Sequence, residues 1–349
     1  MNQQSFARVA GICAVVFLLV PAIHASPVSI ALVPVGDPGN TADTNDGDFV
    51  AVGIQHYGSV PYSYDIGKYD VTLTQYTAFL NAVASSDPNN LYTSNMATDL
   101  NSAGISRSGS SGHYTYSVIG SGQRPVTYVS WFDAARFCNW LTNGQGGAGT
   151  ETGMYTLTGS TSMSGTLPAD HSALVGTKWF VPTEDEWYKA AYYKGGGTNV
   201  GYWAYPFQSD TKPTSNQVSG GSNSGNFKSP TTGYAVTQST TYSSSQNYLT
   251  DVGVYTSAFS PYGSYDMGGD VFQWNETSID SSRGTRGGVW SSDASTSADS
   301  NRNNAGPTFE SSHIGFRVAE LPEPSTITLS ILGAIGVWFA GRRRRVKAV

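Results

Sequence analysis

Cysteine is almost absent from this chain of 349 residues, which has only Cys13 and Cys138. Cys13 lies in an apolar N-terminal run typical of a cleaved secretion signal, so the mature protein would retain Cys138 alone. A single cysteine excludes an intrachain disulfide, even in an oxidising compartment. Cys138 falls on the apolar face of a predicted helix, where we expect a small core residue rather than a reactive thiol.

Histidine and charged residues are also scarce. The five histidines, at positions 24, 56, 113, 171 and 313, are scattered and lack the spacing of metal ligands. The chain has 19 Lys and Arg against 25 Asp and Glu, and the predicted end segments hold six of the former and one of the latter. The remaining 13 basic and 24 acidic residues give a net charge of about −11, which argues against nucleic acid as a partner.

The first 25 residues are predicted to be a signal peptide. Arg8 supplies a positive start, residues 9–20 are apolar, and the stretch that ends at Ala25 suits signal peptidase. The protein is therefore expected to cross the inner membrane.

The C-terminal residues 322–349 have three parts in a fixed order. Pro322-Glu323-Pro324 precedes an uncharged apolar segment at 325–341, and a basic cluster begins at Arg342. About 17 apolar residues are just enough to span a bilayer, and the basic cluster should remain cytoplasmic. This tail resembles the PEP-CTERM sorting signal. The resemblance implies an exosortase as partner, a membrane-anchored precursor, and release to the cell surface or extracellular matrix.

Between these ends, residues 26–45 form a lead-in rich in Pro, Gly, Asp and Asn, and residues 46–320 are expected to form one folded domain. Short strands are predicted at 49–54 and 62–69. Interspersed aromatic residues in the Gly- and Ser-rich stretch 195–245 favour ordered loops over free coil.

Three helices are predicted from apolar spacing and capping residues. The first covers 72–84, where Thr72 and Gln75 can form a capping box. The second covers 131–141 and begins after Ser130, and the third begins at Thr183.

Six short motifs follow one another along most of the chain. They are Ile66-Gly67-Lys68-Tyr69-Asp70-Val71-Thr72; Arg124-Pro125-Val126 through Ser130-Trp131 to Cys138-Asn139-Trp140-Leu141; Pro182-Thr183-Glu184-Asp185-Glu186-Trp187; Tyr265-Asp266-Met267-Gly268-Gly269-Asp270-Val271-Phe272-Gln273-Trp274; Arg286-Gly287-Gly288; and Gly315-Phe316-Arg317. Each motif alone is weak, but all six in this order resemble the sulfatase-modifying-factor family, which includes the formylglycine-generating enzyme. The resemblance implies an α+β, loop-rich fold, an elaborated C-type-lectin-like domain with short twisted sheets and two or three helices.

The same resemblance argues against the family's oxidase activity. Active members carry two copper-binding cysteines between the last two motifs, and this chain has none between Gly288 and Gly315. Neither Ser nor Asp can replace a thiolate in soft-metal or redox chemistry, so we expect no copper. An iron-dependent branch of the superfamily uses histidines in an added helical domain, which is not found in this sequence.

Calcium is the cofactor that the resemblance leaves open. Family members hold it partly through a Gly-Asn-x-Trp-Glu-Trp motif, which corresponds here to residues 269–274. Oxygen ligands on an irregular loop suit calcium. The candidate ligands are Asn226, Phe227 through its carbonyl, Asp270, Val271 and Gln273. The alternative is that Asp270 only caps a turn.

The segment before Gly-Phe-Arg is the candidate ligand surface, because related variable proteins bind ligands there. Its hydrogen-bonding and aromatic side chains suit a polysaccharide such as an exopolysaccharide. The candidate residues are Trp290, Asp293, Asp299, Asn301, Arg302 and Asn303. We therefore expect a non-catalytic, secreted binding or matrix protein. The alternatives are a solvated loop without a ligand and an oxidase with a rearranged site.

Overall fold

The computed structural model describes residues 27–321, apart from 45–48, 51–52, 55, 148, 177 and 219–220. The predicted signal peptide and the C-terminal sorting segment lie outside the described residues. Within the described part of the chain, no helix is both long and apolar enough to span a bilayer.

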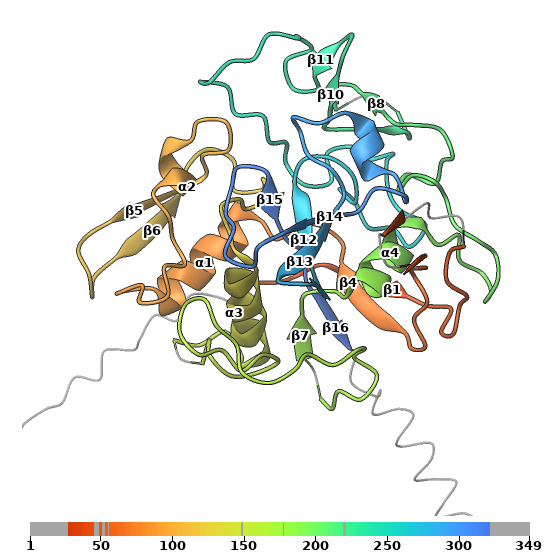
Figure 1. Ribbon diagram of the computed structural model, residues 1–349. Helices are drawn as coiled ribbons and strands as arrows, with labels where there is room; N and C mark the ends of the chain where they lie inside the picture. Colours follow the sequence, from red (N-terminus) through yellow and green to blue (C-terminus); the bar gives the residue numbers. More distant parts are fainter. Residues whose placement is uncertain are drawn as a thin grey trace, which may run out of the picture.

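The helices are few and short, and β12 and β13 lie at the centre with α1 and α3 to one side and α4 to the other (Figure 1). They are α1 (Leu73–Val83), α2 (Asn95–Thr98), α3 (Trp131–Thr142) and α4 (Glu184–Tyr192), with a 3₁₀ turn, η1, at Ala294–Ser297. All three predicted helices are confirmed as α1, α3 and α4. Each of these helices begins with a capping box, at Thr72, Ser130 and Thr183 respectively.

Two four-stranded sheets organise the fold. The first has the order β1 (Leu32–Val35), β4 (Tyr64–Gly67), β16 (Ala319–Leu321) and β7 (Lys178–Phe180), all antiparallel. The second has the order β14 (Asn303–Ala305), β13 (Ser282–Arg286), β12 (Phe272–Ile279) and β15 (Ile314–Gly315), and only β12 and β15 are parallel. These short sheets and few helices confirm the expected α+β, loop-rich fold.

Short antiparallel hairpins and a short parallel pair, β8 with β9, lie outside these two sheets. They are β2 (Phe49–Val50) with β3 (Gly53–Ile54), β5 (Ile105–Ser108) with β6 (Thr115–Val118), β8 (Thr214–Ser215) with β9 (Ser224–Gly225), and β10 (Lys228–Ser229) with β11 (Gly233–Tyr234). The strand predicted at 49–54 is thus two short strands, and the one predicted at 62–69 is β4. The lead-in contributes β1, which its turn-rich composition did not indicate.

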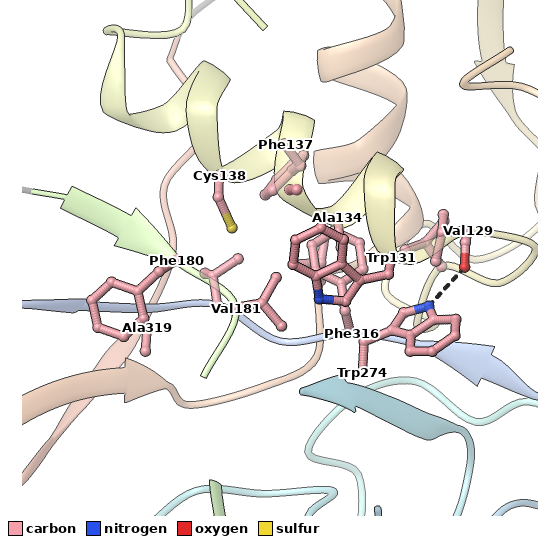
Figure 2. Close-up of a cluster of buried hydrophobic side chains, with 14 of the residues drawn as sticks. Val129, Trp131, Ala134, Phe137, Cys138, Phe180, Val181, Trp274, Phe316 and Ala319 are labelled. Carbon is pink, nitrogen blue, oxygen red and sulfur yellow. Dashed lines mark hydrogen bonds between the residues drawn. The ribbon is translucent and has the colours of Figure 1, made fainter. Parts of the chain in front are cut away.

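The core lies between α3 and the sheets, where aromatic side chains from distant motifs meet (Figure 2). Phe316 packs edge-on against Phe137 of α3 at 5.4 Å between ring centroids. The indole of Trp274 donates a 3.0 Å hydrogen bond to the carbonyl of Val129. Cys138 is fully buried in this cluster, which confirms the prediction that it is a core residue.

A buried guanidinium joins the motifs at the junction of the two sheets. Arg317 lies between β15 and β16 and is completely shielded from solvent. It donates to the Gln273 side chain at 2.7 Å and to the carbonyls of Gly67 and Tyr265 at 2.6 and 2.8 Å. The Nη2 that donates to Tyr265 also contacts the carboxylate of Asp70 at 3.2 Å. The four partners therefore come from two sequence motifs, and Arg317 belongs to a third.

Replacing Arg317 with Gln should lower the free energy of unfolding by about 3–5 kcal/mol, because the change leaves Asp70 buried without its cation. Urea denaturation at neutral pH measures this loss. Arg124→Gln is the matched control, because the Arg124 guanidinium makes no hydrogen bond or ion pair with the described residues. The control should change stability by less than about 0.5 kcal/mol. Equal losses in the two variants would contradict a structural role for Arg317.

Candidate functional site

A groove of about 550 Å³ lies over the second sheet, and each of the four strands contributes to its lining. The contributing residues are Phe272 of β12, Thr285 of β13, Asn303 of β14 and Ile314 of β15. The strand register makes them neighbours, because Phe272 pairs with Ile314 and Thr285 pairs with Asn303. The groove is therefore built on regular hydrogen-bonded structure.

Two loops complete the lining. Ser291 and Ser292 come from the segment after β13, and the segment after β14 supplies Gly306 and Phe309. The Phe309 side chain is 50% exposed, although phenylalanine is usually buried. The groove thus offers one accessible aromatic ring beside hydroxyl and amide groups.

His313 is the one titratable side chain among the described residues that line the groove. Its burial lowers its pKa, because the imidazolium form loses hydration, while the carboxylate of Asp99 acts weakly in the opposite direction. The imidazole is therefore neutral at neutral pH. The groove carries no formal charge under these conditions.

Trp290 does not line the groove but supports it from beneath. Its side chain is only 3% exposed. The indole stacks on Tyr248 at 4.7 Å and on His313 at 5.0 Å between ring centroids. So little of the indole is exposed that it offers no open face for the sugar stacking predicted for Trp290. Instead, Trp290 packs against His313, which does line the groove.

Three other predicted ligand residues lie outside the groove. Asp293 caps η1 by accepting a 2.9 Å hydrogen bond from the Ser295 amide, and it pairs with Lys212 at 3.1 Å. The carbonyls of Asp299 and Asn301 accept hydrogen bonds from Arg286 at 2.8 and 3.1 Å. These contacts give the segment its shape.

Arg302 also binds other parts of the protein. Its Nε donates to one carboxylate oxygen of the buried Glu184 at 3.0 Å, and Arg286 donates to the other oxygen. The Arg302 guanidinium lies 5.0 Å from the Tyr57 ring centroid. An arginine committed to a buried carboxylate is not free to bind a sugar.

Asn303 is therefore the one predicted ligand residue that the structure places in the groove. Sequence reasoning missed the other lining residues, among which Thr285, Asn304, Phe309, Ser311 and His313 supply most of the polar and aromatic surface. Four of these five lie in the segment before Gly-Phe-Arg, which the sequence indicates as the candidate surface. Extending the candidate set to residue 313 would have found them.

The Asp270 side chain, the strongest calcium candidate, is occupied by protein donors. It accepts hydrogen bonds from the Asn226 amide group at 2.9 Å, the Thr250 backbone at 3.1 Å and the Thr250 hydroxyl at 2.7 Å. Asp270 also adopts a positive φ of 62° and is 3% exposed. Burial raises its pKa to about 7. This arrangement matches the alternative reading, in which Asp270 holds a turn.

Two of the other calcium candidates also accept hydrogen bonds from protein donors. The Phe227 carbonyl accepts from Ala235 and Ser215, and the Gln273 oxygen accepts from Trp187 and Arg317, both at 2.7 Å. Val271 packs beside Trp290 in a buried apolar cluster. No group of three His, Cys, Asp or Glu side chains that could hold a metal occurs among the described residues. The oxygens of Asp270, Gln273 and Phe227 would have to give up protein donors to coordinate calcium.

The groove can form hydrogen bonds and apolar contacts, but its described lining includes no cysteine and no carboxylate. The oxidase activity of the family would need thiolates. Cys138 cannot supply one, because burial raises the pKa of its thiol well above the ordinary value. The arrangement is suited to binding a neutral, hydroxyl-rich ligand.

Comparisons with known proteins extend over nearly the whole described chain. The solved structure of Treponema denticola variable protein 1 is 21% identical, with a TM-score of 0.48, and the match covers 84% of this chain and 96% of that one. A crystal structure of CarF is 19% identical, with a TM-score of 0.48 and coverage of 84% and 99%. PvdO from Pseudomonas aeruginosa is 18% identical, with a TM-score of 0.43 and coverage of 84% and 92%.

The chain matches no curated protein. The family comparison is decisive, because its match runs from residue 28 to residue 321 and includes both sheets, the three capped helices and the groove. The chain belongs to the family of the sulfatase-modifying factor enzyme 1-like domain.

Proposed function

We propose that this protein is a secreted or surface-attached, non-catalytic binding protein whose groove recognises a neutral polysaccharide. The observation that supports it is the lining of the groove, in which an exposed phenylalanine lies beside amides and hydroxyls without a formal charge.

Each part of this lining suits a sugar. Asn303 and Asn304 carry amide groups that both donate and accept, as sugar hydroxyls do. The ring of Phe309 can cover the apolar C–H face of a pyranose, and such rings carry much of the contact energy at binding surfaces. A neutral groove avoids the desolvation of a charge when the ligand binds.

Two single substitutions test this proposal. Phe309→Ala and Asn303→Ala should each weaken binding to a neutral oligosaccharide about tenfold, which corresponds to about 1.4 kcal/mol. Both side chains are exposed, so neither change should alter the melting temperature. Calorimetric titration against glucose-, galactose- and mannose-based oligosaccharides gives the affinities.

Phe259→Ala is the matched control, because Phe259 is 37% exposed and does not line the groove. Its affinity should equal that of the unmodified protein. Binding that survives both groove substitutions would refute the proposed site. Copper-stimulated oxidation of a cysteine peptide would instead favour the oxidase alternative.

We also propose that export and sorting bring the groove to the cell surface or matrix. The supporting feature is the tripartite C-terminal segment, with an exosortase as the expected partner. Deleting residues 342–349 should impair retention of the precursor in the inner membrane, because the basic cluster anchors the apolar segment. Immunoblots of membrane and medium fractions, with and without an exosortase, measure precursor size and location. Precursor of one size in both hosts would rule out processing.

Calcium should not contribute to this function, since protein donors already satisfy Asp270. Exchanging a chelator for millimolar calcium should leave the melting temperature unchanged. A native-state calcium site would add about 2.7 kcal/mol at a hundredfold excess over Kd, which is a shift of several degrees. Differential scanning calorimetry distinguishes the two results, and such a shift would mean that Asp270 exchanges its donors for a cation.

A further inference from the structure

A second cavity, of about 360 Å³, shares no lining residue with the groove. One part of its lining is polar and comes from the second sheet and the start of α4, namely Glu276, Thr277, Ser278, Arg283 and Thr183. The other part is the loop at 163–169, which contributes apolar groups such as Leu167 and Ala169. Register pairs Ser278 with Arg283, so the polar residues form one continuous surface.

The Arg283 guanidinium has more N–H groups than there are acceptors around it. It lies 4.3 Å from the ring centroid of Trp131, and its Nη1 donates to the backbone carbonyl of Glu276 at 2.8 Å. The other N–H groups meet no acceptor in the described part of the chain. Partial burial lowers the pKa of Arg283 through loss of hydration, although the guanidinium stays charged at neutral pH. A partly desolvated guanidinium favours an oxyanion as partner.

Two threonine hydroxyl groups in the cavity also have donors that exceed the acceptors around them. The Thr183 oxygen accepts the amide of Glu186 at 3.2 Å, and the Thr277 oxygen accepts the amide of Glu184 at 2.9 Å. Each hydroxyl still has its own proton to donate, and no acceptor for it is found among the described residues. Both threonines therefore add donors to those of Arg283.

The carboxylate of Glu276 also lines the cavity, but it does not consume these donors. One oxygen lies 3.3 Å from His171 Nε2, and the other accepts from the Tyr155 hydroxyl at 2.5 Å. Burial alone would lower the pKa of His171, but the carboxylates of Glu186 and Glu276 raise it to about 10. The imidazolium that results is shared, because it also lies 2.9 Å from Glu186, and it offsets part of the charge of Glu276.

We propose that this cavity binds the oxyanion group of a small molecule. The guanidinium N–H groups of Arg283 donate to this oxyanion, and the hydroxyls of Thr183 and Thr277 donate to its remaining oxygens. The apolar loop at 163–169 covers the body of the molecule. Planar carboxylate matches the guanidinium best, and phosphate and sulfate share the same acceptor-only chemistry. This site is independent of the proposed polysaccharide groove.

Calorimetric titration of the full exported protein tests the proposal with four probes: glucuronate, glucose 6-phosphate, glucose 6-sulfate and uncharged glucose. At least one charged probe should bind saturably at this site, and glucose should not. Arg283→Gln should weaken that binding at least tenfold. Ala169→Trp, at an exposed position on the cavity wall, should block entry without changing the melting temperature, so it decides the question if Arg283→Gln fails to fold.

Two controls separate this site from the rest of the surface. Arg124→Gln removes an arginine outside the cavity, and Phe309→Ala disables the groove, so both should retain full affinity for the charged probe. Affinity unchanged by Arg283→Gln or Ala169→Trp would overturn the proposal. So would the failure of all three anions to bind at about 10 mM, where even a millimolar Kd gives saturation.

Discussion

The burial of the Arg317 guanidinium is the constraint on which the rest of this structure depends. A charge without any access to water is tolerated only when it is paired and hydrogen-bonded, and here the partners come from both ends of the folded chain. Gly67 ends β4 of the first sheet and Asp70 follows shortly after it, whereas Gln273 lies in β12 of the second. Satisfying one cation therefore fixes the two sheets relative to each other. In a second clamp, Arg286 and Arg302 share Glu184. This pairing joins α4 to the end of β13 and to the loop before β14.

These clamps explain why the groove is neutral. Polar and charged side chains near the groove bind other parts of the protein: Arg302 donates to Glu184, Asp293 caps η1, and Gln273 accepts from Arg317. The same holds for the aromatic residue Trp290, which is buried beneath His313. What remains at the groove is a set of amides, hydroxyls and one exposed ring. This division favours a rigid support with a variable surface, a common arrangement for binding sites on loops.

The sequence predicted those parts of the fold that local chemistry determines. Thr72 and Thr183 mark helix starts because a hydroxyl and a glutamine or glutamate three residues later cap each other. β1 escaped prediction because it lies in a lead-in rich in Pro, Gly, Asp and Asn, where composition favours turns, and it forms by pairing with β4. The candidate site was harder, since Trp290 and Phe309 lie in one segment and composition cannot tell which ring is buried. That choice depends on Tyr248, 42 residues before Trp290, which fills one face of the indole.

The measurement that tests the central claim most directly is a nuclear magnetic resonance titration of the isotope-labelled protein with a neutral oligosaccharide. A groove on a rigid frame predicts that amide shifts concentrate at Asn303, Asn304, Phe309 and His313. The amides around Arg317 should stay unchanged, because the clamp does not move when the ligand binds. Shifts spread through the frame, or centred on residues away from the groove, would contradict this account.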